Sequence, residues 1–245
     1  MVVMLLCGCE VIRENEQLIP VTPTTSGTRT HVLLEYTGFR CVNCPTAAET
    51  AASLQTIYGE QLVVVALHPA SNTFTQGKAE YDYTCPEADS IYCFMGGTPT
   101  TPFPTGNIDI VPTEDGYFID KDNWAKQLNS LLIDTVAPYL RASAVLDTVT
   151  RTISVTAEYN PREDMRLSVW LVEDSVLGAQ AMPDGTVNTA YYHRHMMRAA
   201  TDQTTLTLPA KCRPAYCSIV ALLIDNNDQH IYNAYETDLH LSTHP

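Results

Sequence analysis

Hydrophobic residues recur along the first half of the chain in runs that predict strands alternating with a helix. Residues 32–36 form a β-prone run that ends at a Thr-Gly pair, and residues 62–67 form a continuous apolar run of strand length. Between them, residues 46–58 place alanine, leucine and isoleucine at helical spacing. Pro45 suits the first turn, because its missing amide is not needed there. This strand, helix, strand order predicts a right-handed parallel crossover.

A long polar stretch follows over residues 68–98, and after it come signals for two strands and a helix. Residues 105–111 and 116–119 are predicted to pair as antiparallel strands. Asp120 or Asp122 is predicted to cap a helix that ends before Pro138. The pattern of the first half therefore indicates an α/β domain.

After Pro138 the pattern changes to short alternating runs. Several short strands separated by turn residues are typical of an antiparallel β-sandwich of immunoglobulin or fibronectin type. The predicted strands are residues 152–157, 167–172, 205–208, 218–224 and 230–234. We therefore expect an α/β domain over residues 29–140 and an all-β sandwich domain over residues 141–245.

The first nine residues form an apolar run that ends in small residues and Cys9. The segment Leu6-Cys7-Gly8-Cys9 resembles a lipobox, in which cleavage before the last cysteine frees it for lipid attachment. Residues 1–8 are then a signal remnant, and residues 9–28 are a lipidated cysteine followed by a tether rich in Pro, Thr and Ser. The run lacks a positively charged start and is too short to span a bilayer. A buried first strand over residues 1–8 is the alternative.

The charge balance argues against nucleic acid as a partner. Fourteen basic and twenty-eight acidic residues give this chain of 245 residues a formal net charge of −14, which repels phosphate groups. The arginines are scattered and form no basic platform for stacked bases. Hydrophobic residues make up 45% of the chain and charged residues 17%, so most of it is expected to fold.

The eight cysteines fall into close pairs, which suits an oxidising compartment where disulfides persist. The pairs are Cys7 with Cys9, Cys41 with Cys44, Cys85 with Cys93, and Cys212 with Cys217. Disulfides are predicted between Cys212 and Cys217, across a turn that contains Pro214, and between Cys85 and Cys93. A zinc site built from two pairs is the alternative, but the spacing from Cys85 to Cys93 is too wide for the usual ligand pair. No metal site is predicted.

Cys41 and Cys44 form a Cys-Val-Asn-Cys motif where the first strand gives way to the helix. Free amides and the positive end of a helix stabilise a thiolate and lower its pKa, and Arg40 adds a cation. Cys41 is therefore the candidate nucleophile and Cys44 the candidate resolving thiol. The alternative is a purely structural disulfide, because the motif also occurs in inert pairs.

The segment from Val32 to Pro45, with its strand, short loop and dithiol, resembles the thioredoxin family. In that family an acidic residue six positions before the first cysteine assists proton transfer from the buried thiol, and Glu35 occupies this position. The family also has a cis-proline facing the dithiol, a role that the resemblance assigns to Pro104. The sequence departs from the family in lacking the tryptophan before the dithiol and the Gly-Pro within it.

A second resemblance covers nearly the whole chain. Residues 35–45, 84–87, 103–107 and 193–198 resemble segments of the twenty-eight-kilodalton outer-membrane lipoprotein family of Bacteroides-type bacteria. In that family a thioredoxin-like region precedes a β-rich region, and the proteins are envelope lipoproteins with adhesive or binding roles. The resemblance implies a lipid-anchored outer-membrane protein on the periplasmic or cell-surface side. It also implies an envelope or extracellular protein partner and no cofactor.

Two functions follow from these signals. The first is a tethered thiol-disulfide oxidoreductase, which the placement of Cys41 and Glu35 favours. The second is a non-enzymatic adhesion or binding lipoprotein on a redox-inert thioredoxin scaffold. His193 and His195 would share one side of a strand and could hold a metal, but no third ligand is evident nearby, so hydrogen bonding between domains is the favoured interpretation.

Overall fold

The computed structural model describes residues 27–77, 83–133 and 136–242, and its main feature is one continuous sheet of ten strands. In sheet order, the strands are β12 (Thr205–Thr207), β7 (Thr152–Tyr159), β6 (Leu140–Asp147), β14 (Ile231–Leu241), β13 (Cys217–Asp225), β8 (Met165–Glu173), β11 (Met196–Thr201), β3 (Leu62–Leu67), β2 (His31–Tyr36) and β4 (Thr105–Ile108). Strands from both halves of the sequence therefore share the sheet.

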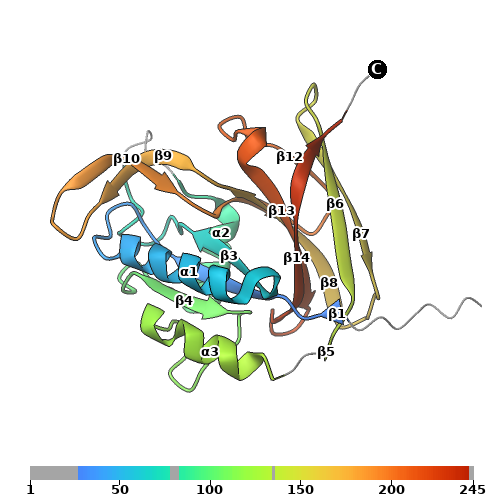
Figure 1. Cartoon of the computed structure of the whole chain (residues 1–245), viewed down its shortest axis with the longest axis horizontal. Coiled ribbons are helices and arrows are strands. Elements are labelled where there is room, and N and C mark those ends of the chain that lie inside the picture. The colour runs from blue at the N-terminus through green and yellow to red at the C-terminus, as the bar shows by residue number, and fades with distance from the viewer. Residues whose placement is uncertain (1–26, 78–82, 134–135, 243–245) are drawn as a thin grey trace, which may run out of the picture.

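The predicted crossover of the first half is confirmed. β2 and β3 are parallel and in register from His31 opposite Leu62 to Tyr36 opposite Leu67, and α1 (Cys44–Tyr58) connects them. All residues of both strands are buried, which explains their unbroken apolar runs. α1 lies across one face of these strands, and α3 (Trp124–Leu131) lies near β4 at the lower edge of the view (Figure 1).

Three details of the first half differ from the prediction. Residues 116–119 make isolated bridges rather than a strand, because Gly116 turns the chain at a positive φ of 104°. Asp120 caps a short 3₁₀ turn, η4 (Lys121–Asn123), and α3 then ends at Leu131, earlier than expected. The polar stretch contains a helix, α2 (Pro86–Phe94), which its weak hydrophobic periodicity did not reveal.

The predicted separate β-sandwich is not confirmed. β11 pairs in parallel with β3, with Met196 opposite Ala66, and β8 and β13 continue the sheet from there. β8 and β13 are buried along almost their whole length instead of alternating, because the first half of the chain covers their second face. The fold is mixed α/β, and a boundary at residues 140 and 141 stays a prediction.

β13 contributes to two hydrophobic cores, one on each face of the sheet. One core lies against β6 and β7, and the other lies against β2, β3 and α2. β13 gives Ile219, Ala221 and Leu223 to the first core, and Val220, Leu222 and Ile224 to the second. This period-two division of one strand between two cores ties the two halves of the chain together.

Two pairs of strands lie outside the large sheet. β9 (Val176–Ala181) and β10 (Val187–His193) form a hairpin that projects beyond the start of α1 (Figure 1). β1 (Gly27–Thr28) pairs with β5 (Val136–Ala137). Within the ranges described, no helix is both long and apolar enough to cross a membrane.

Candidate functional site

Cys41 and Cys44 are joined by a disulfide at the turn between β2 and α1, with their Cα atoms 5.4 Å apart. Cys44 is the first residue of α1, and Pro45 follows it in the first turn, as the sequence predicts. The amide of Cys41 donates to the carbonyl of Gly38 at 3.0 Å and closes the loop. Cys41 is only 1% exposed and Cys44 only 2%, so neither sulfur lies open to solvent.

Glu35 lies on β2, on the face that α1 covers, and is almost completely buried. Its neighbour along the same face is Leu33, which packs with Ala47 and Ala51 of α1. Oε1 of Glu35 has no hydrogen-bond partner among the residues that the structure describes. Burial in this apolar setting raises the pKa of Glu35 from its ordinary value to about 8.

The peptide bond between Phe103 and Pro104 is cis, which confirms the prediction for this bond. β4 begins at the next residue, with Thr105 opposite Tyr36 at the carboxyl end of β2. Phe103 packs in the same hydrophobic core as both cysteines. The proline loop and the dithiol therefore belong to the same end of the sheet.

The hairpin of β9 and β10 packs against the dithiol loop, a contact between distant parts of the chain that the sequence analysis missed. The amide of Ala181 donates to the carbonyl of Phe39 at 2.7 Å. Nε2 of Gln180, a buried side chain, donates to the carbonyl of Cys41 at 2.8 Å. The sequence does signal the hairpin turn, because Asp184 and Gly185 follow one β-compatible run and precede another.

His193 is placed in an aromatic cluster rather than in a metal site. Its ring lies 4.6 Å from that of Tyr83, 4.9 Å from that of Tyr191 and 5.8 Å from that of His68. Burial lowers the pKa of His193 to about 4 and holds that of His68 well below its ordinary value, so both rings are neutral at pH 7.

His195 does not share a strand face with His193, because β10 ends at His193 and His195 adopts a positive φ of 51°. The Nδ1 atom of His195 lies 3.7 Å from Oδ2 of Asp174. Across the described ranges, no group of three or more His, Cys, Asp or Glu side chains is arranged to hold a metal ion.

The prediction of a disulfide between Cys85 and Cys93 is wrong, because both thiols are free in this structure. Cys85 caps α2 and Cys93 lies in its last turn. The helical rise separates their Cα atoms by roughly 12 Å, beyond the reach of a disulfide. Cys212 and Cys217 are also free thiols, and their side chains are close enough to interact. Cys9 lies outside the described residues.

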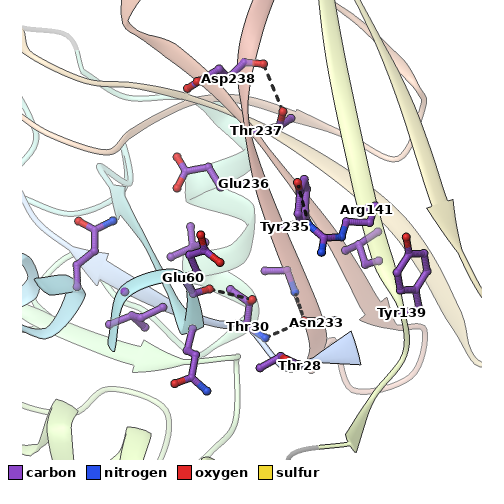
Figure 2. Close-up of a pocket in the computed structure, with 17 residues that line it drawn as sticks. Thr28, Thr30, Glu60, Tyr139, Arg141, Asn233, Tyr235, Glu236, Thr237 and Asp238 are labelled. Carbon is purple, nitrogen blue, oxygen red and sulfur yellow. Dashed lines mark hydrogen bonds between the residues drawn. The ribbon is translucent and has the colours of Figure 1, made fainter. Parts of the chain in front are cut away.

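A cleft of about 850 Å³ lies away from the dithiol, between the C-terminal end of α1 and the strands β6 and β14. Figure 2 shows Glu60 and Thr30 on one side of it, and Tyr235 and Arg141 on the other. The guanidinium of Arg141 lies 5.1 Å from the centre of the Tyr235 ring. The lining mixes polar and apolar side chains and contains more acidic than basic ones.

No protein-family model matches the chain, and no curated protein matches it at a significant level. A domain of the outer membrane lipoprotein Omp28 from Porphyromonas gingivalis aligns with 16% identity over 44% of this chain and 100% of that chain, at a TM-score of 0.28. That score is too low to support an argument.

Two solved structures support the fold. A protein from Agrobacterium tumefaciens aligns with 13% identity and a TM-score of 0.51, over 89% of this chain and 99% of that chain. HBP35 of Porphyromonas gingivalis aligns with 16% identity and a TM-score of 0.61, over 90% of this chain and 79% of that chain. Identities this low establish a common fold alone, and the chain shares its mixed α/β fold with HBP35.

Proposed function

We propose that the protein is an envelope lipoprotein that exchanges thiols and disulfides with partner proteins at Cys41 and Cys44. The main support for this proposal is the position of Glu35. It is a buried carboxyl group on the strand that leads into the dithiol loop, and one of its oxygens has no hydrogen-bond partner among the described residues. Its pKa of about 8 is close to that of an ordinary thiol, which suits proton exchange between the two groups.

The exchange begins from the reduced dithiol. The thiolate of Cys41 attacks a sulfur of the partner disulfide, forms a mixed disulfide and releases one partner thiolate. Glu35 in its ionised form takes the proton of Cys44, and the sulfur of Cys44 then attacks that of Cys41. This second attack releases the other partner sulfur as a thiolate and leaves the Cys41–Cys44 disulfide found in the structure. Two electrons pass to the partner, which is reduced to a dithiol.

Trapping of the mixed disulfide tests this order of events. Cys44→Ser should accumulate a covalent complex with a disulfide-bonded substrate such as insulin, whereas Cys41→Ser should accumulate none. Glu35→Gln should slow the second attack more than the first. Cys93→Ser, at an exposed cysteine on α2, is the matched control and should leave trapping unchanged.

A second candidate function is favoured by the burial of both sulfurs beneath the hairpin. In this case the dithiol is a structural disulfide in a binding or adhesion lipoprotein, and the cleft of Figure 2 is a candidate ligand site. This function predicts that purified protein neither reduces insulin nor oxidises a dithiol peptide. It also predicts that both serine variants lose only stability.

A further inference from the structure

Cys212 and Cys217 form a second close pair of cysteines at another place in the sheet. They flank η5 (Pro214–Tyr216), and Cys217 begins β13 opposite Glu173 at the end of β8. Both side chains are buried, with exposures of 3% and 7%, and the two thiols lie close enough to interact. β13 is four strand positions from β2, so this pair lies roughly 19 Å from the strand that leads to Cys41, at the usual strand spacing.

A buried guanidinium faces one sulfur of this pair. Nε of Arg198, on β11, donates to Sγ of Cys212 at 3.3 Å. The same Nε lies 3.3 Å from Oε2 of Glu173, whose other oxygen lies 3.2 Å from Nε of Arg213. The neighbouring Cys217 side chain, together with Arg198, lowers the pKa of Cys212. A nearby cation stabilises the thiolate, and the thiolate is the form of cysteine that reacts as a nucleophile.

The second sulfur is held in its protonated form. Sγ of Cys217 donates to the carbonyl of Arg213 at 3.3 Å, and the neighbouring Cys212 and burial raise its pKa. The guanidinium of Arg213 lies 4.1 Å from the centre of the Tyr216 ring, and both residues belong to the short segment between the two cysteines. Both side chains are partly exposed, so we expect a reagent to reach Cys212 by way of η5.

We propose that Cys212 and Cys217 are a second redox-active pair, which converts between dithiol and disulfide by exchange with a low-molecular-weight disulfide. The thiolate of Cys212 attacks one sulfur of the small disulfide, forms a mixed disulfide and releases one small thiolate. This thiolate takes up the proton of Cys217. The sulfur of Cys217 then attacks that of Cys212, closes the intramolecular disulfide and releases the second small thiolate. Two electrons pass from the pair to the small molecule.

Arg198 favours the reduced form of this pair over the disulfide. Contact with the guanidinium stabilises the reduced, thiolate form, and a stabilised reduced form makes the corresponding disulfide easier to reduce. The pair is therefore expected to be a dithiol in a mildly reducing glutathione buffer and a disulfide in an oxidising one. A structural disulfide would stay closed across the same range.

The test uses the full chain with Cys41→Ser and Cys44→Ser, so its outcome is independent of the proposed exchange at that site. The protein is equilibrated in glutathione buffers of increasing oxidised fraction, free thiols are alkylated, and peptides are mapped by mass spectrometry. The expected result is a reversible transition from two free thiols to a disulfide between residues 212 and 217. Thiols that stay free in oxidised glutathione, or a disulfide that persists in reduced glutathione, would overturn the proposal.

Single variants test the roles of the two sulfurs. Cys217→Ser should accumulate a glutathione adduct at Cys212, whereas Cys212→Ser should accumulate at least tenfold less at Cys217. Arg198→Met should slow alkylation of Cys212 at pH 7 about tenfold; if this variant does not fold, the pH dependence of alkylation in the unmodified protein gives the same information. Cys85 is the internal reference, because burial raises its pKa to about 11. Equal adducts at both sulfurs, or equal pH profiles for Cys212 and Cys85, would contradict the proposal.

Discussion

Nε2 of Gln180 donates to the carbonyl of Cys41 at 2.8 Å and so connects the β9–β10 hairpin directly to the dithiol loop. The same nitrogen lies 3.4 Å from the carbonyl of Gly38, and the amide of Ala181 bonds to the carbonyl of Phe39. The second half of the chain therefore contributes the β9–β10 hairpin to the dithiol site, whose cysteines belong to the first half. We therefore expect access of a partner to Cys41 to depend on this hairpin.

Gln180→Ala should make the Cys41–Cys44 disulfide easier to reach. The variant loses the hydrogen bonds of the side-chain amide, which stabilise the closed hairpin by on the order of 1 kcal/mol, so the hairpin should open about fivefold more often. The measurement is the rate of reduction by dithiothreitol. Thr189→Ala, at an exposed position of β10, should reduce at the original rate. Equal rates for all three proteins would show that the hairpin does not limit access.

Glu35→Gln should stabilise the protein, and the effect should grow with pH. Burial raises the folded pKa of Glu35 to about 8 from 4.5, so at pH 4 the group is mostly neutral in both states and the two proteins should be nearly equally stable. As the pH rises above 4.5, the unfolded chain ionises while the folded protein does not, and the original protein loses stability until about pH 8. The difference in free energy of unfolding should reach about 3 kcal/mol at pH 7.

Urea unfolding at pH 4 and pH 7 measures this difference. Glu49→Gln, at an exposed position of α1, is the matched control and should show no growing difference. A stabilisation by Glu35→Gln that is the same at both pH values would contradict ionisation as the cause.

The two cysteines of α2 should react at very different rates. Cys93 is exposed and should be alkylated by a maleimide within minutes in the folded protein. Cys85 is buried, and burial raises its pKa to about 11, so it should react only after unfolding. Peptide mapping that recovers the two joined by a disulfide in folded protein would contradict the placement of both on α2.

Lipid attachment at Cys9 stays a prediction from the Leu6-Cys7-Gly8-Cys9 segment. Cys9→Ser should release the protein from the membrane fraction of cells, because acyl chains provide the anchor at about 0.8 kcal/mol for each buried methylene. The measurement is membrane fractionation followed by mass spectrometry of the N-terminal peptide. An unmodified Cys9 within an intact N-terminus would contradict lipidation.

The strands and helix of the first half could be predicted from the sequence, because each is marked by residues within or next to it. The run at residues 62–67 is apolar throughout, and Pro45 and Gly59 mark the two ends of α1. The cis bond before Pro104 came from the thioredoxin resemblance rather than from periodicity. These features depend on residues that lie close together in the chain.

The connection between the halves could not be predicted in the same way. β8 and β13 have buried residues on both faces, a pattern that also fits a strand inside a separate domain. Only the pairing of Met196 with Ala66 shows that their sheet continues into β3. The contact between Gln180 and Cys41 is likewise tertiary, and a polar side chain in a hairpin carries no signal for its distant partner.

The strand order of the sheet has a consequence for biogenesis. β3 pairs with β2 on one side. Its other edge stays unpaired until β11 is synthesised, and β11 lies much later in the sequence. Until then the valine-rich edge of β3 is open, and an open hydrophobic edge is where another chain can add a strand. A copy that begins to fold before its second half is complete is therefore expected to be most prone to misassembly at Val63, Val64 and Val65, and a chaperone has most to protect there.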